Sequence, residues 1–116
     1  MKIAIVGSRG INAPDIERYI PDGVTEIVSG GAVGVDSSAR EYAIKQGIKT
    51  VDFLPNYSKY GRRAPIVRNR EIAEYADCAL IFWDGISRGT KNIIECFKKA
   101  GKEIILVIDD MIFEKE

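Results

Sequence analysis

Residues 29–39 read Ser29-Gly30-Gly31-Ala32-Val33-Gly34-Val35-Asp36-Ser37-Ser38-Ala39, and this stretch decides the fold. An apolar run, residues 25–28, precedes it, and a helical pattern, residues 39–45, follows. A strand that ends in closely spaced glycines and turns into a helix exposes backbone N–H groups at the positive end of that helix, and glycine leaves room for an anion. The same pattern, an apolar run followed by a glycine-containing turn and a helix, recurs at residues 83–90, which read Trp83-Asp84-Gly85-Ile86-Ser87-Arg88-Gly89-Thr90. Two such loops predict a ligand that carries phosphate, with a nucleotide as the simplest choice.

Around these loops, apolar runs of strand length alternate with runs of helical period. The apolar runs are rich in Ile and Val, which is typical of parallel strands covered on both faces. The pattern predicts an α/β, three-layer Rossmann-like fold with a mainly parallel five-stranded sheet, as a single domain over residues 1–116. In the strand order 3-2-1-4-5, a ligand crevice lies between the first and fourth strands. The predicted strands are Lys2–Val6, Glu26–Ser29, Thr50–Leu54, Cys78–Trp83 and Glu103–Ile108, and the predicted helices are Pro14–Ile20, Val35–Gln46, Pro65–Tyr75 and Thr90–Ala100.

Two segments depart from the alternation. Residues 55–64 are rich in Tyr, Gly and Arg, and we predict a long loop there, of the kind that often carries function. The charged tail, residues 109–116, is expected to form a short helix or a frayed, flexible end.

Composition excludes several classes of function. The chain has 17 Lys and Arg against 17 Asp and Glu, so no global field holds a polyanion and sequence-independent nucleic-acid binding is not favoured. Histidine is absent, which removes the commonest general base and zinc ligand, and we predict neither a metal nor another cofactor. Cys78 and Cys96 lie within predicted elements and are expected to be small buried residues in a reducing compartment. No run approaches the roughly 20 apolar residues of a membrane span, so we predict a soluble, cytoplasmic protein.

Two common nucleotide motifs are absent from the sequence. The first turn, residues 7–10, reads Gly7-Ser8-Arg9-Gly10 rather than the G-x-G-x-x-G of dinucleotide-binding domains. The sequence also contains no G-x-x-x-x-G-K-[ST] loop, so ordinary NTPase chemistry is not expected.

Residues 29–36 resemble the S/G-G-x-A-x-G-x-D motif of the SLOG superfamily. This group includes the DNA-processing protein A (Smf) family and the LOG-type cytokinin-activating phosphoribohydrolases. Further segments narrow the resemblance to the YspA-type, YpsA-related branch, and the similarity runs in order from Gly7 to about Lys102. These segments are Tyr60-Gly61-Arg62-Arg63-Ala64-Pro65-Ile66-Val67-Arg68-Asn69-Arg70-Glu71-Ile72, Ala76-Asp77, Asp84-Gly85 and Ser87-Arg88-Gly89-Thr90.

The resemblance implies a Rossmann-like domain that binds a nucleotide or a nucleotide-derived ligand, and it is compatible with a homodimer. One departure concerns catalysis. LOG enzymes carry G-G-x-G-T-x-x-E with a catalytic Glu, whereas Ile93 stands three residues beyond Thr90. Glu95 lies about 200° away from that position on a helix and should face elsewhere. The positions that match the superfamily are Gly7, Ser8, Arg9, Gly30, Gly31, Gly34, Asp36, Arg68, Asn69, Gly89 and Thr90.

Several of these residues have a structural explanation beside the functional one. The glycines of residues 30–34 serve either a tight turn or contact with phosphate. Asp36 either favours the dipole of the helix that it begins or contacts the ligand. Asp84 is either an ordinary turn residue or an acceptor for a ribose hydroxyl. Ser87 and Thr90 cap a helix, bind phosphate, or do both with the same helix end.

The segment from Lys59 to Arg70 carries five basic residues and no acidic one. Solvated surface charge is the ordinary explanation. Arg68 and Arg9 are expected near the crevice, where guanidinium groups suit phosphate oxygens. Asn69 either reads the edge of a base or ribose or caps the helix.

Three functions therefore compete. The first is binding of a nucleotide or ADP-ribose-like ligand, by a sensor or carrier. The second is hydrolysis of an N-glycosidic or phosphate bond, with Asp36, Asp84 or Glu95 as acid or base. The third is binding of single-stranded DNA by the basic segment, with Tyr57 and Tyr60 stacking on bases.

Overall fold

Five parallel strands and one antiparallel strand form the sheet of the computed structural model, which describes residues 1–13, 15–30, 34–109 and 111–115. The strand order is β3-β2-β1-β4-β5-β6, and β6 pairs antiparallel with β5. The predicted parallel sheet and its order are confirmed. The strands are β1 (Lys2–Gly7), β2 (Glu26–Ser29), β3 (Lys49–Asp52), β4 (Cys78–Phe82), β5 (Glu103–Ile108) and β6 (Met111–Lys115).

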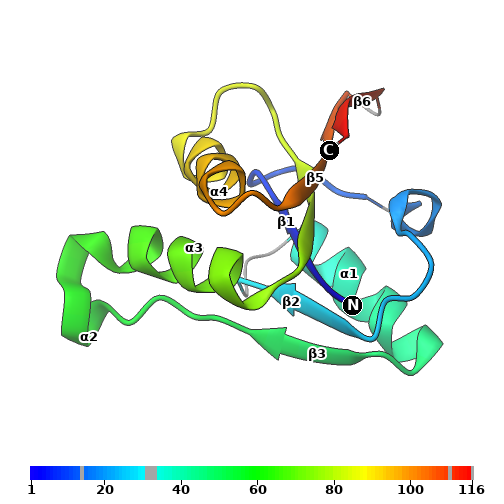
Figure 1. Ribbon diagram of the computed structural model, residues 1–116, viewed down its shortest axis with the longest axis horizontal. Coiled ribbons are helices and arrows are strands. Elements are labelled where there is room, and N and C mark those ends of the chain that lie inside the picture. The colour runs from blue at the N-terminus through cyan, green and yellow to red at the C-terminus, as the bar shows by residue number, and fades with distance from the viewer. Residues whose placement is uncertain (14, 31–33, 110, 116) are drawn as a thin grey trace.

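Helices cover both faces of this sheet (Figure 1). On one face lie the 3-10 turn η1 (Ile16–Tyr19) and α1 (Val35–Gln46), whereas α3 (Ala64–Tyr75) and α4 (Arg88–Lys99) lie on the other. A short helix, α2 (Tyr57–Tyr60), and the 3-10 turn η2 (Gly61–Arg63) lead into α3. No helix in the described ranges is long and apolar enough to cross a membrane.

Two apolar cores follow from the alternation of side chains along the strands. Ile3 and Ile5 of β1 pack with Val35 and Ala39 of α1, while Ala4 faces the opposite core. The opposite core contains Ile72, Ala73, Ile93, Ile94 and Phe97 from α3 and α4. Since both faces of β1 and β4 are covered, their apolar sequences are continuous, as predicted.

The strand order changes direction at β1: β2 and β3 lie on one side of it, and β4 and β5 lie on the other. This strand pairs with β2 on one side and with β4 on the other, and Gly7 lies opposite Phe82 at the carboxyl ends. In open α/β sheets, ligands bind outside the carboxyl ends of the strands where the order reverses. The structure thus places the carboxyl ends of β1 and β4 side by side, at the position where the sequence predicts the crevice.

Four local predictions need correction. Residues 57–63 form α2 and η2 rather than a loop, because the Asn56 side chain accepts a hydrogen bond from the Lys59 N–H (3.1 Å) and caps α2. The tail contains β6 instead of a short helix or a frayed end, because the outer edge of β5 offers it unpaired backbone groups. β3 is a mostly exposed edge strand rather than a covered one. The helix predicted at residues 14–20 is a short 3-10 turn, and Pro14 itself is outside the described residues.

Both cysteines are free thiols. Cys78 is buried, as predicted, whereas Cys96 is only half-buried. Burial raises the pKa of each thiol, which makes both poor nucleophiles.

Candidate functional site

A cleft of about 360 Å³ opens at the carboxyl ends of β1 and β2, between α3 and the start of α4. This volume lies within the roughly 300–1,000 Å³ of small-molecule sites. Segments far apart in the sequence converge there because the parallel strands all end at this edge of the sheet. The predicted site residues that line the cleft are Gly7, Ser8, Arg9, Gly30, Asp36, Arg68, Asn69, Ser87, Gly89 and Thr90.

Other predicted site residues lie elsewhere. Gly34 has a φ of 84°, and its Cα faces the carbonyl oxygen of Ile11. Asp84 borders a separate cavity on the other side of the edge, with Asn12 and Trp83. Glu95 borders a groove between the outer surfaces of α3 and α4, as its helical position predicts. Gly31 is outside the described residues.

Sequence reasoning missed several apolar lining residues. Pro65 and Ile72 line the cleft with Arg68, and Ile93 lines it with Gly89. Each of these three residues lies three or four positions from a recognised one, and residues with this spacing share a helix face. The helical period was therefore the signal that could have found them.

Ser8 ties the end of β1 to the start of α4. Its N–H donates to the carbonyl of Phe82 (2.9 Å), and its Oγ accepts from the Asp84 N–H (3.2 Å). The same Oγ lies 3.1 Å from Thr90 Oγ1, and both side chains are buried. Since these hydroxyls bond to each other, they form the fixed floor of the cleft.

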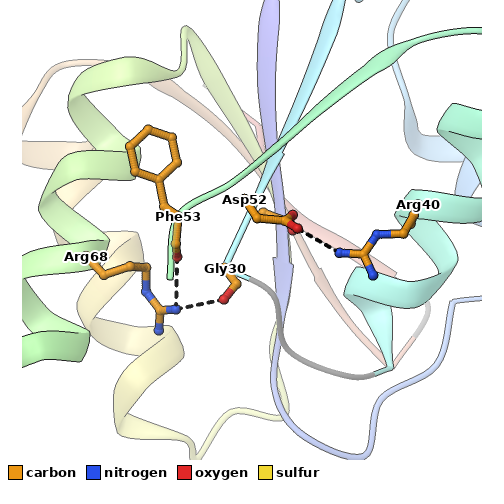
Figure 2. Close-up of polar contacts among 6 residues, drawn as sticks. Gly30, Arg40, Asp52, Phe53 and Arg68 are labelled. Atoms are coloured by element: carbon orange, nitrogen blue, oxygen red, sulfur yellow. Dashed lines mark hydrogen bonds and ion pairs between the residues drawn. The ribbon is translucent and has the colours of Figure 1, made fainter. Parts of the chain in front are cut away.

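Arg68 is the most constrained cation of the cleft. Its Nη1 donates to the carbonyl oxygens of Gly30 (3.0 Å) and Phe53 (3.5 Å), as Figure 2 shows. Burial lowers the pKa of the guanidinium, and Asp36 and Tyr57 act in the opposite direction. An arginine remains protonated in this situation. Its charge is therefore held at a defined position in the cleft wall.

Asn69 holds the Nε side of that guanidinium. Its Oδ1 accepts from Arg68 Nε (3.0 Å), and its Nδ2 donates to Asn92 Oδ1 (2.9 Å) and to the Gly89 carbonyl (3.4 Å). The side chain is 5% exposed. Its amide thus joins α3 to the first turn of α4, rather than capping a helix as one prediction allowed.

Asp84 organises the turn that precedes α4. Its Oδ1 accepts from the N–H groups of Ile86 (2.8 Å) and Ser87 (2.7 Å), and its Oδ2 accepts from Ser87 Oγ (2.7 Å). These bonds, led by the Ser87 N–H, lower the pKa of Asp84 from 3.8 to about 2. The carboxylate thus fixes the direction in which α4 begins.

The carboxylates near the start of α1 are also engaged. Asp36 is 3% exposed and borders the cleft. Behind it, Asp52 accepts from Ser29 Oγ (2.8 Å) and pairs with Arg40 at 3.0 Å (Figure 2). Among the described lining residues, Asp36 is the single acidic side chain and Arg9 and Arg68 are the basic ones.

An anion in the cleft would have two kinds of partner, the guanidinium groups of Arg9 and Arg68 and the first backbone N–H groups of α4. The first intrahelical bond of α4 runs from the Lys91 N–H to the Ser87 carbonyl (3.1 Å), so the N–H groups of residues 88–90 precede it and need other acceptors. A Cβ at Gly89 would meet no atom within 4 Å.

The described residues hold no group of three or more Asp, Glu or Cys side chains that could bind a metal ion.

The chain was compared with known proteins. No curated protein matches it significantly. The sequence profile of the family described as DNA recombination-mediator protein A matches residues 1–65, from β1 to the first turn of α3. The match agrees with the resemblance to DNA-processing protein A, while the YspA-type branch stays a prediction. Because it covers more than half of the 116 residues, the chain belongs to the DNA recombination-mediator protein A family.

Proposed function

We propose that the cleft binds the phosphate of a nucleotide or of a nucleotide-derived ligand, such as a nucleoside phosphate or an ADP-ribose-like molecule. The observation that carries the proposal is the position of Arg68. Three of its N–H···O bonds hold the guanidinium against the protein, and Nη2 makes no hydrogen bond to any residue that the structure describes. Guanidinium groups bind phosphate oxygens well.

The start of α4 lies across the same cleft from Arg68. Its first N–H groups and its positive dipole end favour an anion, and Gly89 presents no side chain there. Arg9 adds a second positive charge to the lining. Tyr57, 61% exposed at the rim, offers a ring on which a base can stack.

Hydrolysis of the ligand has less support. Of the three carboxylates considered from the sequence, only Asp36 borders the cleft, whereas Asp84 and Glu95 border other cavities. A general acid or base needs to reach the reacting atom. Binding without turnover is therefore the function that we propose.

Single-stranded DNA is the second candidate, and two observations favour it. The chain belongs to the DNA recombination-mediator protein A family. Residues 57–63 also place the exposed rings of Tyr57 and Tyr60 in one short segment with Lys59, Arg62 and Arg63, and Tyr57 lines the cleft. Aromatic rings and basic side chains are the usual partners of single strands. In this case the cleft would hold one backbone phosphate of the DNA strand.

A thermal-shift and calorimetry panel tests both candidates. The panel contains AMP, ADP-ribose, NAD, nucleoside triphosphates, inorganic phosphate and a short single-stranded oligonucleotide. A ligand at 100 times its Kd adds about 2.7 kcal/mol to the free energy of unfolding. We expect stabilisation by at least one small nucleotide. Stabilisation by the oligonucleotide alone, with strong dependence on salt, would transfer the function to DNA.

Two variants of α3 locate the binding. Arg68→Ala should weaken binding about ten-fold, since it removes hydrogen bonds from a charged group, and the stabilisation should fall accordingly while binding stays measurable by calorimetry. Arg70→Ala removes the same charge from the same helix, but Arg70 borders the outer groove rather than the cleft, and this matched control should bind normally. Equal losses in both variants would mean that only the general charge of α3 matters, and the proposed site would be wrong.

A further inference from the structure

Asn92 lies on the side of α4 that faces away from the cleft. It borders the outer groove, about 510 Å³, which lies between α3 and α4 and also contains Glu95 and Cys96. Its Oδ1 nevertheless accepts a hydrogen bond from Asn69 Nδ2 at 2.9 Å. Asn69 in turn borders the cleft. Through its hydrogen bond to Asn69, the Asn92 amide therefore connects the outer groove to the cleft.

The hydrogen bonds of this connection have one consistent direction. Arg68 Nε carries only a donor, so the atom of Asn69 that it meets must be the acceptor Oδ1. Nδ2 of Asn69 then faces two oxygens, the Gly89 carbonyl and Asn92 Oδ1. Turning the Asn69 amide over would place its oxygen against both of these acceptors and its NH₂ against the donor Nε. The acceptors on α4 thus fix the orientation of the amide.

Of these two acceptors, Asn92 makes the shorter bond, at 2.9 Å against 3.4 Å for Gly89. The bond from Asn69 to Arg68 in turn sets the plane of the guanidinium, because Nε, Nη1 and Nη2 are coplanar. With Nε and Nη1 engaged by protein oxygens, the plane determines where Nη2 points.

We infer that Asn92 is a positioning residue for anion binding in the cleft: through Asn69, it holds the Arg68 guanidinium in the plane that presents Nη2 to a phosphate. This inference rests on the proposed function. It assigns a binding role to a side chain that lines the outer groove and not the cleft. Loss of this part-buried hydrogen bond should weaken phosphate binding about five-fold.

The first experiment needs no ligand. In the ¹⁵N-labelled protein, NMR measures the exchange of the Arg68 Nε–H with water, and the Arg68→Ala variant identifies the signal. Asn92→Leu should accelerate this exchange, because the Asn69 amide loses its shorter acceptor. Asn92→Asp should preserve slow exchange, because a carboxylate oxygen also accepts from Nδ2. Cys96→Ala is the control, since Cys96 Sγ donates only a weak hydrogen bond to Asn92 Oδ1, at 3.8 Å, and its loss leaves that oxygen available to Asn69 Nδ2. Unchanged exchange in Asn92→Leu would overturn the inference.

The second experiment uses AMP and inorganic phosphate as probes in a double-mutant cycle. Asn92→Leu should weaken binding about five-fold in the wild-type background and should have no effect in an Arg68→Ala background. An equal loss in both backgrounds would show that Asn92 acts on the fold rather than through Arg68. If the wild-type protein binds neither probe, the proposed function fails for them, and the exchange data still decide whether Asn92 orients Arg68. Asn92→Ala provides a second variant if Asn92→Leu does not fold.

Discussion

A Cβ at Gly34, in the loop after β2, would lie 2.6 Å from the backbone carbonyl oxygen of Ile11, whereas a Cβ at Gly89, in the loop and helix start after β4, would meet no atom within 4 Å. The sequence predicts that both loops bind phosphate in the same way. In the structure, their described glycines differ. Gly30 and Gly34 make room for neighbouring parts of the protein, and Gly89 leaves the end of α4 open. A glycine-rich loop is therefore a weak indication of a ligand until its neighbours are known.

The largest effect should come from Gly34→Ala. The new Cβ would clash with fixed backbone, and the φ of 84° is strained for any residue with a side chain. We expect the free energy of unfolding to fall by about 3 kcal/mol, measured by urea unfolding. Gly10→Ala is the control, since Gly10 has a φ of 85° but open space around it. It should lose only about 1 kcal/mol. Equal losses in the two variants would mean that the contact with Ile11 has no effect.

Gly30→Ala should have an intermediate effect that depends on Arg68. The new Cβ would lie 2.7 Å from Arg68 Nη1, and the guanidinium would have to leave the carbonyl of Gly30. We expect a loss of about 1 kcal/mol in the free energy of unfolding and weaker binding of AMP. In an Arg68→Ala background the same substitution should be nearly neutral. A loss that persists there would place the strain elsewhere in the loop.

The contribution of Asp84 to the loop after β4 can be measured from the pH dependence of the free energy of unfolding. Its folded pKa, about 2, lies below the unfolded value of 3.8, so its contribution to stability is fully present above about pH 4 and is lost as the pH falls toward 2. Asp84→Asn removes this titration. The difference in free energy of unfolding between wild type and variant should therefore narrow from pH 5 to pH 2. A difference independent of pH would show that the charge on Asp84 does not stabilise the turn.

The smallest effect on stability should come from Gly89→Ala, and it should be opposite in sign. Alanine suits a helix better than glycine, so the free energy of unfolding should rise by up to about 1 kcal/mol. Because Cβ atoms lean toward the N-terminus of a helix, the methyl group should obstruct an anion at the end of α4 and weaken AMP binding. Stronger or unchanged binding in calorimetry would contradict an anion position over this turn.

The sequence allowed the five parallel strands, their order and the edge of the sheet at which the cleft lies to be predicted, because these depend on local periodicity and on the shared edge of parallel strands. Arg68 was found because its basic segment runs into a predicted helix and resembles a known family. Asn92 was not found, since its bond to Asn69 joins residues 23 positions apart across a helix interface. Likewise, the three hydrogen bonds of Asp84 depend on turn geometry that the Asp-Gly pair alone does not specify. Side-chain networks of this kind need coordinates.

The exposed strand β3 has a consequence for association. It is the terminal strand of the described sheet, only four residues long, and it pairs with β2 on one side. Such an edge is a template on which another chain can add a strand. Here Lys49 and Asp52 are exposed along it, and Asp52 is paired with Arg40. A second chain that extended the sheet would have to desolvate these charges, so the edge discourages fibrous self-assembly.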